Sequence, residues 1–507
     1  MNSIELSLFV NRLQAVAREM GATLRRTSFS PNIRDRLDFS CAIFNENGEL
    51  CAQAAHIPVH LGSMAYAMRE IVNGIVWHAG DMVLVNDPYL GGTHLPDVTL
   101  IAPLFTDGRL TAFCANRAHH ADIGCPRPGS MPLSRTLAEE GLVISPCYYL
   151  REGKLDPQTQ QMLSEGLRNP RSTLGDFAAQ ISANRVGLER LEALSQRLGG
   201  SSIGRAFEEV NDYAELLARN TLRDIPDGHY HARDYMDDDG AGTTQVGIEM
   251  TVDVVGEQVT VNFSGTSDMV PGNINCPLSV TAAAVYYVFY ALMPDATPPC
   301  AGTLRPLNIV VPPRCLINAC APAAVAAGNV ETSQRIVDVL LAALAEALPE
   351  RIPAASQGTM NNVAMGGVDW DYYETIGGGC GGHAKGRGLD AAHSHMTNTL
   401  NTPVEVLEMN YPLRVRRYAV RYGSNGKGLQ PGGNGIVREY EFLEAAAVTI
   451  LGERRLSSPP GHVGGGAGEP GRNLLNNRRL DGKCEIDVLP GDCLCLETPG
   501  GGGWGKL

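Results

Sequence analysis

Apolar residues recur along the chain with the two periods that distinguish helices from strands. From Glu5 to Leu24 they recur every three or four residues, which predicts an amphipathic helix. Residues 41–52 alternate around an Asn-Gly pair, and residues 97–119 contain an Asp-Gly pair, so each stretch is expected to form a β-hairpin. The apolar run from Val280 to Met293 predicts a buried core helix, because it is too short to span a bilayer.

The pattern changes character twice along the chain. Helical spacing dominates from Asp156 to about Arg219, with a break expected at Gly199-Gly200, and alternating strands follow Pro226. Further helices are expected over 277–293 and 331–348, and strands with glycine-rich turns fill the last third. We therefore expect an α+β protein with several lobes, mixed sheets and extensive glycine-rich ordered loops. The predicted domains are an N-terminal α+β domain at 1–225, a middle α+β domain at 226–350 and a β-rich, glycine-rich domain at 351–507.

Composition narrows the classes of function. With 507 residues the chain is too long for a single hydrophobic core. A formal charge of −14 argues against a broad electrostatic grip on nucleic acid, which needs clustered Lys and Arg. The first residues lack the features of a signal peptide, and the thirteen cysteines include no CxxC pair, which is typical of a reducing compartment. We expect a cytoplasmic protein that binds neither nucleic acid nor membrane.

Candidate chemistry is concentrated in residues 85–98 and 117–124. Together these segments hold three carboxylates and three imidazoles within thirty-six residues, and each contains a histidine and an aspartate three positions apart. A mixed set of imidazole and carboxylate donors suits manganese, iron or zinc. The hairpin expected at 97–119 would bring the segments together. The predicted metal ligands are Asp87, His94, Asp97 and His119, where Asp87 is either a ligand or the partner of a ligating histidine; otherwise these histidines only cap turns.

Other residues have a functional and a structural interpretation. Glu331, near the start of an expected helix, is a candidate general base or a structural carboxylate. His395 lies in a polar run that suits a small amide or carboxylate substrate, or that forms a hydrogen-bonded loop. His56 and His60 have the i, i+4 spacing of helical metal ligands, but Pro58 between them argues against a helix, so they are cleft or core histidines.

Several longer motifs together resemble the hydantoinase B/oxoprolinase family, and the resemblance runs from the first expected helix to the C-terminus. The motifs are residues 20–27, 55–64, 86–97, 128–132, 328–335, 396–403 and the closing Thr498-Pro499 with its glycines. The resemblance implies a subunit of an ATP-dependent cyclic-amide hydrolase of the hydantoinase or 5-oxoprolinase type. It also implies a bound metal at His94, Asp97 and His119.

The resemblance further implies a division of labour between two subunits. A hydantoinase A-type partner would bind ATP with Mg²⁺ and phosphorylate the oxygen of a small cyclic amide, which agrees with the lack of a Gly-x-x-x-x-Gly-Lys-Ser/Thr loop in this chain. This chain would then open the ring with water activated by manganese, zinc or iron, while Asp122 or Glu331 accepts a proton. The expected assembly is a hetero-oligomer.

Two other classes of function remain open at this stage. The chain could be a subunit of an ATP-dependent carboxylase of the acetone or acetophenone type, which would consume bicarbonate. It could also be a non-catalytic scaffold subunit, which would bind no metal. Metal analysis distinguishes the scaffold from the enzymes, and labelled bicarbonate distinguishes the two enzymes.

Overall fold

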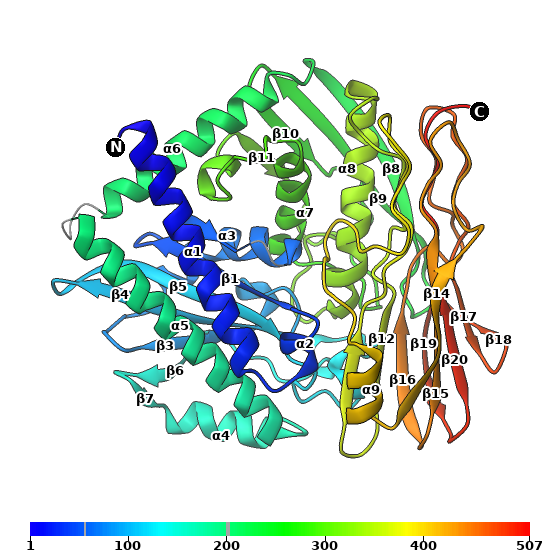
Figure 1. The fold of residues 1–507 in the computed structure, drawn as a ribbon, viewed down its shortest axis with the longest axis horizontal. Coiled ribbons are helices and arrows are strands. Elements are labelled where there is room, and N and C mark those ends of the chain that lie inside the picture. The colour runs from blue at the N-terminus through cyan, green and yellow to red at the C-terminus, as the bar shows by residue number, and fades with distance from the viewer. Residues whose placement is uncertain (55–56, 199–202) are drawn as a thin grey trace.

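The N-terminal part of the protein is built on a seven-stranded sheet. A computed structural model describes residues 1–54, 57–198 and 203–507 (Figure 1). The strand order is β2-β1-β5-β4-β3-β6-β7, and every neighbouring pair is antiparallel. The strands are β1 (Phe39–Asn45), β2 (Leu50–Gln53), β3 (Met82–Val85), β4 (Asp97–Thr106), β5 (Arg109–His119), β6 (Cys147–Arg151) and β7 (Lys154–Leu155).

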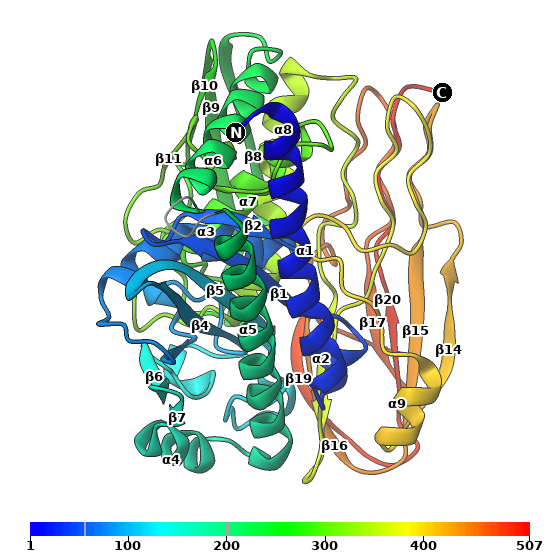
Figure 2. The ribbon, with the colours of Figure 1, turned by 60° about the vertical axis from the view of Figure 1, so that its left-hand side comes forward.

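Helices cover both faces of this sheet, which is why β1 and β3 are buried at every position. Cys41 and Ile43 of β1 pack into a core with α1 (Ser3–Thr27), α5 (Pro170–Leu198) and α6 (Ile203–Leu222). Ala42 and Phe44, on the opposite face, pack against α3 (Pro58–Asn73). Figure 2 shows α1 and α5 lying side by side along the sheet, with the short helices α2 (Pro31–Arg34) and α4 (Pro157–Gly166) near their ends.

A four-stranded sheet and two helices form the middle of the protein. The order is β11-β10-β9-β8, in which only the β10–β11 pair is parallel. Alternate residues of β9, from Val246 to Val254, form a core with α7 and α8. The elements are β8 (Gly228–Asp238), β9 (Thr244–Val255), β10 (Gln258–Asn262), β11 (Leu307–Val310), α7 (Leu278–Ala291) and α8 (Ser333–Ala347), and a π-helical turn over Gly328–Thr332 precedes α8.

The C-terminal part is a sandwich of two sheets, seen at the right of Figure 1. The orders are β13-β12-β16-β19 and β14-β15-β20-β17-β18, and one apolar core with residues from both sheets lies between them. The elements are β12 (Asn362–Gly366), β13 (Asp371–Glu374), α9 (Val404–Asn410), β14 (Leu413–Arg421), β15 (Gly435–Phe442), β16 (Ala446–Leu451), β17 (Arg472–Leu475), β18 (Arg478–Leu480), β19 (Lys483–Val488) and β20 (Cys493–Glu497).

Glycine-rich loops beside this sandwich pack backbone against backbone. The amide of Gly501 donates to the carbonyl of Gly433, and the amide of Gly433 donates to the carbonyl of Cys380. A Cβ atom on Gly501 would lie 2.0 Å from the Cys380 oxygen, and one on Gly433 would lie 1.8 Å from the Leu389 oxygen. These loops are therefore ordered because they lack side chains, as the sequence predicted.

Buried ion pairs connect the middle sheet to the C-terminal sandwich. The Arg335 guanidinium lies 2.7 Å from Asp234 and 3.2 Å from Glu453, and Lys483 pairs with Glu453 from the other side. Glu331 adds a further carboxyl to this buried region. Burial, reinforced by the nearby Glu453, raises the pKa of Glu331 to about 8.

Most of the expected elements form where the sequence placed them. The N-terminal helix, both hairpins and the buried helix α7 are present, and the α+β class is confirmed. The expectation that Pro58 argues against a helix is wrong: Pro58 opens α3, because the first turn of a helix needs no amide donor there. The Gly199-Gly200 break lies outside the described residues, and the two boundaries between the three predicted domains stay predictions. No helix in the described ranges is both long and apolar enough to cross a membrane.

Replacing Gly501 by alanine should destabilise the protein by at least about 2 kcal/mol, because the new methyl group would overlap the Cys380 carbonyl. Gly204→Ala is the matched control, since a Cβ atom at Gly204 meets nothing within 4 Å. Thermal unfolding should give a clearly lower midpoint for Gly501→Ala and no loss for Gly204→Ala. Equal midpoints would contradict this account of the loops.

Glu331→Gln should become more stable relative to the wild type as the pH rises from about 5 to about 8. The folded protein keeps the Glu331 proton up to pH about 8, whereas the unfolded chain releases it near its ordinary pKa of 4.5. Raising the pH across this window therefore favours unfolding through Glu331, and glutamine cannot release a proton. The difference in unfolding midpoint between the two proteins should grow with pH, while Glu189→Gln at an exposed site shows a constant difference.

Candidate metal centre

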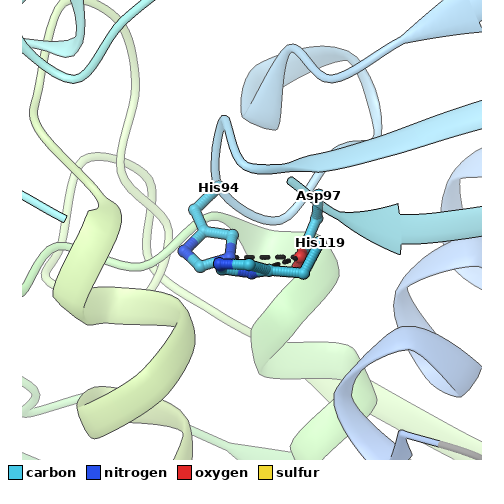
Figure 3. A group of neighbouring side chains, drawn as sticks. All are labelled: His94, Asp97 and His119. Atoms are coloured by element: carbon cyan, nitrogen blue, oxygen red, sulfur yellow. Dashed lines mark hydrogen bonds and ion pairs between the residues drawn. The ribbon is translucent and has the colours of Figure 1, made fainter. Parts of the chain in front are cut away.

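The facing ends of β4 and β5 bring three of the predicted ligands together. Asp97 opens β4 opposite His119, which ends β5, and His94 belongs to the turn that leads into β4. His94 Nε2 lies 3.2 Å from Asp97 Oδ1, and His119 Nδ1 lies 3.1 Å from the same oxygen. All three side chains are buried, and one donor atom from each lies within 4.8 Å of the others. Figure 3 shows both rings directed to the Asp97 carboxylate.

The hydrogen bonds of His94 leave one of its lone pairs free for a metal. Its Nδ1 atom lies 3.3 Å from the carbonyl oxygen of Ala326, which can only accept, so in the neutral ring Nδ1 carries the proton and Nε2 does not. Neither His94 Nε2 nor His119 Nε2 has a hydrogen-bond partner in the described part of the chain. A carbonyl that orients an imidazole from behind is the usual arrangement at protein metal sites, so these donors fit a divalent ion.

The second oxygen of Asp97 is held by residues that the sequence analysis did not assign to the site. Thr93 Oγ1 donates to Asp97 Oδ2 at 2.6 Å and Asn329 Nδ2 does so at 3.3 Å. His60 Nε2, on the first turn of α3, lies 3.1 Å from the same oxygen, and its Nδ1 lies 3.2 Å from Ser40 Oγ. His60 therefore belongs to the site, whereas His56 lies outside the described residues.

The charge of this buried group is concentrated on Asp97. Burial raises the pKa of the Asp97 carboxyl, but the imidazoles of His94, His60 and His119 outweigh burial and hold that pKa well below its usual range. Burial lowers the pKa of His94, yet the neighbouring Asp97 leaves it raised overall. Burial dominates at His119 and lowers its pKa. The carboxylate is thus ionised at neutral pH, as a metal ligand must be.

The three candidate ligands line a cavity of about 20 Å³, which has room for an ion or a water molecule but not for a ring. Asp38 and Asp97 are the carboxylate residues in its wall among the described residues, and the backbone amide of His119 donates to the Asp38 carbonyl at 3.0 Å. The wall also contains five apolar side chains, namely Ile57, Val59, Val330, Met360 and Met396, and its remaining residues are polar or aromatic. A larger cavity, about 750 Å³ between α1 and residues 295–299, shares none of these lining residues.

Two other predicted site residues lie outside this cavity wall because they hold backbone turns. The Asp87 carboxylate accepts from the amide of Tyr89 at 2.9 Å and caps a short 3-10 helix. The Asp122 carboxylate accepts from the amides of Gly124, Arg168 and Asn169, where α5 begins. Within the described ranges, neither is part of the ligand group, so the structure does not support Asp87 as a ligand or Asp122 as a proton acceptor there.

Glu331 and His395 also lie behind the described cavity wall rather than in it. Glu331 Oε1 accepts from Asn362 Nδ2 at 2.7 Å, and its raised pKa keeps the carboxyl protonated at neutral pH, which does not suit a general base. The His395 ring packs edge-on against Tyr287, and its Nε2 lies 3.7 Å from Asp338. The residues beside each of them, Val330 and Met396, form the wall instead.

Tyr373 connects the metal centre to the residues behind the cavity wall. Its ring stacks on His119 with 4.6 Å between the ring centres, and its hydroxyl donates to Asn362 Oδ1 at 2.7 Å. The Arg36 guanidinium lies 5.0 Å from the centre of the Tyr373 ring and donates to the Tyr373 carbonyl. The plane of the His119 ring is thus fixed by a residue that sequence spacing could not reveal, because 254 positions separate the two.

Comparison with known proteins agrees with the motifs in the sequence. The chain is 39% identical to a 5-oxoprolinase of Dictyostelium discoideum. The match covers the whole of this chain and 40% of that protein. It is similar to the crystal structure of an ATP-dependent caprolactamase from Pseudomonas jessenii, with a TM-score of 0.91, 28% identity, and coverage of 100% of this chain and 91% of that one.

A nucleotide-free acetone carboxylase structure has a TM-score of 0.89 over 99% of this chain and 76% of its own, but at 17% identity this likeness shows the fold alone. The chain thus spans less than half of the 5-oxoprolinase, and almost all of the caprolactamase chain. The sequence model described as Hydantoinase B/oxoprolinase matches residues 2–507. With that match over nearly its whole length, the chain belongs to the hydantoinase B/oxoprolinase family.

Proposed function

We propose that this chain is a subunit of an ATP-dependent cyclic-amide hydrolase and opens a phosphorylated lactam or hydantoin ring with a metal-activated water. The observation that carries the proposal is the buried group His94, Asp97 and His119, whose donor atoms lie within 4.8 Å of one another. This donor set suits manganese or zinc, and also iron. The two relatives support the substrate class, because 5-oxoproline and caprolactam are both cyclic amides.

The chemistry of an amide explains why ATP and a metal would both be needed. Resonance makes the carbonyl carbon of an unstrained amide a poor electrophile, and phosphorylation of its oxygen removes that protection. A divalent ion at this site would lower the pKa of a water molecule and hold the water for the activated carbon. Because the cavity of about 20 Å³ has no room for a ring, its wall would have to open for the ring to reach this water. The water oxygen then bonds to that carbon, and the carbon–nitrogen bond of the ring breaks as the amine nitrogen gains a proton. The acyl phosphate that remains takes up a second water, which releases phosphate and leaves a carboxylate.

The residues of this chain would orient the ligands and move the proton. The Ala326 carbonyl fixes His94 so that its Nε2 faces the ligand group, and Asp97 carries the negative charge that a cation needs. Because Asp38 is the other carboxylate residue in the described cavity wall, it replaces Asp122 and Glu331 as the proposed proton acceptor.

ATP with Mg²⁺ would be bound by a hydantoinase A-type partner in a hetero-oligomer. The sequence has no phosphate-binding loop of the Gly-x-x-x-x-Gly-Lys-Ser/Thr kind. The match to the 5-oxoprolinase covers 40% of that protein, so the larger remainder of that enzyme has sequence without a counterpart here. We propose that a second polypeptide supplies the corresponding nucleotide site.

The wild-type protein, purified with its ATP-binding partner, should hold about one divalent ion per chain and open a cyclic amide only when ATP is present. His94→Ala should lose the ion and at least 99% of the ring opening, because Nε2 is a ligand. His78→Ala is the control, since 61% of that side chain is exposed and it pairs with Asp81 instead. Metal content is measured by mass spectrometry and ring opening by product analysis.

Full ring opening by metal-free His94→Ala protein would exclude this mechanism. Incorporation of labelled bicarbonate into product by the same complex would favour the carboxylase function. A wild-type protein that binds no metal, with an assembly unaffected by His94→Ala, would favour a scaffold.

Replacing Tyr373 tests how the His119 ring is held. Tyr373→Leu removes the stacked ring and should weaken metal binding by about tenfold or more, in the range seen when the residues behind metal ligands are changed. Tyr373→Phe keeps the stacking and loses only the bond to Asn362, so it should weaken binding much less. Affinity is measured by competition with a chelator. Equal losses in the two variants would show that stacking is not what holds His119.

A further inference from the structure

A second cavity, of about 280 Å³, lies on the other side of the β5 end from the metal centre. It is enclosed by the turn before α2, by the start of α5, by the β12–β13 turn and by the end of α9. His119 and His120 are successive residues at the end of β5, and His120 lines this cavity while His119 lines the metal cavity. Its volume is near the lower end, about 300 Å³, of sites that take small molecules.

His120 offers this cavity a hydrogen-bond acceptor. The Gln180 amide nitrogen donates to the Val98 carbonyl at 3.0 Å, so its oxygen must accept from His120 Nε2, which lies 3.1 Å away. In the neutral ring the proton is then on Nε2, and Nδ1 is a bare acceptor. His120 is 1% exposed, and its Nδ1 has no hydrogen-bond partner among the described residues.

Asn32 and Ser30 offer donors to the same cavity. Asn32 Oδ1 accepts from the Arg36 guanidinium at 3.2 Å, which identifies Nδ2 as the other end of the amide. Asn32 is 2% exposed, and neither its Nδ2 nor the hydroxyl of Ser30 has a hydrogen-bond partner within the described ranges. Both residues line the cavity. A buried donor and a buried acceptor without partners are uncommon in folded proteins, and at a cavity they indicate a ligand.

The charges around the cavity favour a cationic group on that ligand. Asp122 and Asp176 both line it, and in the described part of the chain their carboxylates accept from backbone amides and form no ion pair. Asp371 also lines it but is neutralised by Arg168 at 2.7 Å. Two carboxylates without a direct ion pair therefore lie beside the space that the neutral donors and the acceptor share. Arg34 also lines the cavity, but its guanidinium pairs directly with Asp35 at 3.0 Å and interacts with Asp176 only at longer range.

We infer that this cavity binds a small zwitterion with an ammonium and a carboxylate group, that is, a small amino acid. The ammonium would donate to His120 Nδ1 and lie near Asp122 and Asp176. The carboxylate would accept from Asn32 Nδ2 and the Ser30 hydroxyl. Opening a cyclic amide yields a molecule of this class, and the suggestion that the occupant is the product rests on the proposed function.

Binding is tested by calorimetry on the full complex, without ATP, with 6-aminohexanoate and 4-aminobutanoate as probes and with hexylamine and hexanoate as single-charge controls. At least one amino acid should bind at least tenfold more tightly than either control compound. Asn32→Asp, which keeps the acceptor for Arg36 and replaces the donor by a carboxylate, should weaken that binding at least tenfold. Asn410→Asp is the matched control, because it adds the same charge at an exposed position of the cavity and should change binding less than threefold.

Ser30→Ala provides a second variant if Asn32→Asp does not fold, and it should weaken binding at least threefold. His94→Ala should bind the amino acid like the wild type, which separates this cavity from the metal centre. Loss of binding in His94→Ala, equal losses in Asn32→Asp and Asn410→Asp, or no binding of either amino acid would each overturn the inference. This test measures binding and needs no turnover. The complex could therefore open the ring without binding the amino acid in this cavity, and it could bind the amino acid without opening the ring.

Discussion

The ionised and fully buried carboxylate of Asp97 is the group on which the site depends. A carboxylate that leaves water without compensation is too costly to keep, so the fold must surround it with donors. Thr93 comes from the turn before β4, His119 from the end of β5, His60 from α3, and Asn329 from the π-helical turn before α8. The position of each of these elements is therefore coupled to one charge.

This dependence explains which parts of the site could be read from the sequence. The β4–β5 hairpin is local, and its Asp-Gly turn and alternation place Asp97 opposite His119, so the pair was predictable. His60, Asn329 and Tyr373 reach the site only through packing between distant segments, and no spacing rule records that. The roles of Asp87 and Asp122 could not be read from the sequence for another reason: an aspartate after a strand is as well suited to capping a turn as to binding a metal. In the structure both carboxylates accept from backbone amides at turns.

Because the site depends on several distant segments, it does not belong to one predicted domain. The predicted metal site lies within residues 1–225, yet the cavity wall also contains Val330 from the predicted middle domain and Met360, Tyr373 and Met396 from the predicted C-terminal one. The buried pairs of Arg335 and Lys483 with Glu453 connect those two segments behind the wall. The metal cavity is thus a junction of all three segments, and its geometry depends on their packing together.

The end of β5 offers a short physical connection between the metal centre and the second cavity. Successive side chains of an extended backbone point to opposite sides, so one peptide unit joins His119, in the metal cavity, to His120, in the other wall. Each ring is also stacked on an aromatic partner, Tyr373 for His119 and Phe177 for His120, so neither can turn without displacing a packed neighbour. Because both rings are held by their partners, a ligand that contacts His120 without turning it leaves His119 in place. Coupling between two binding equilibria is reciprocal, so an amino acid that leaves His119 undisturbed is itself bound independently of the metal.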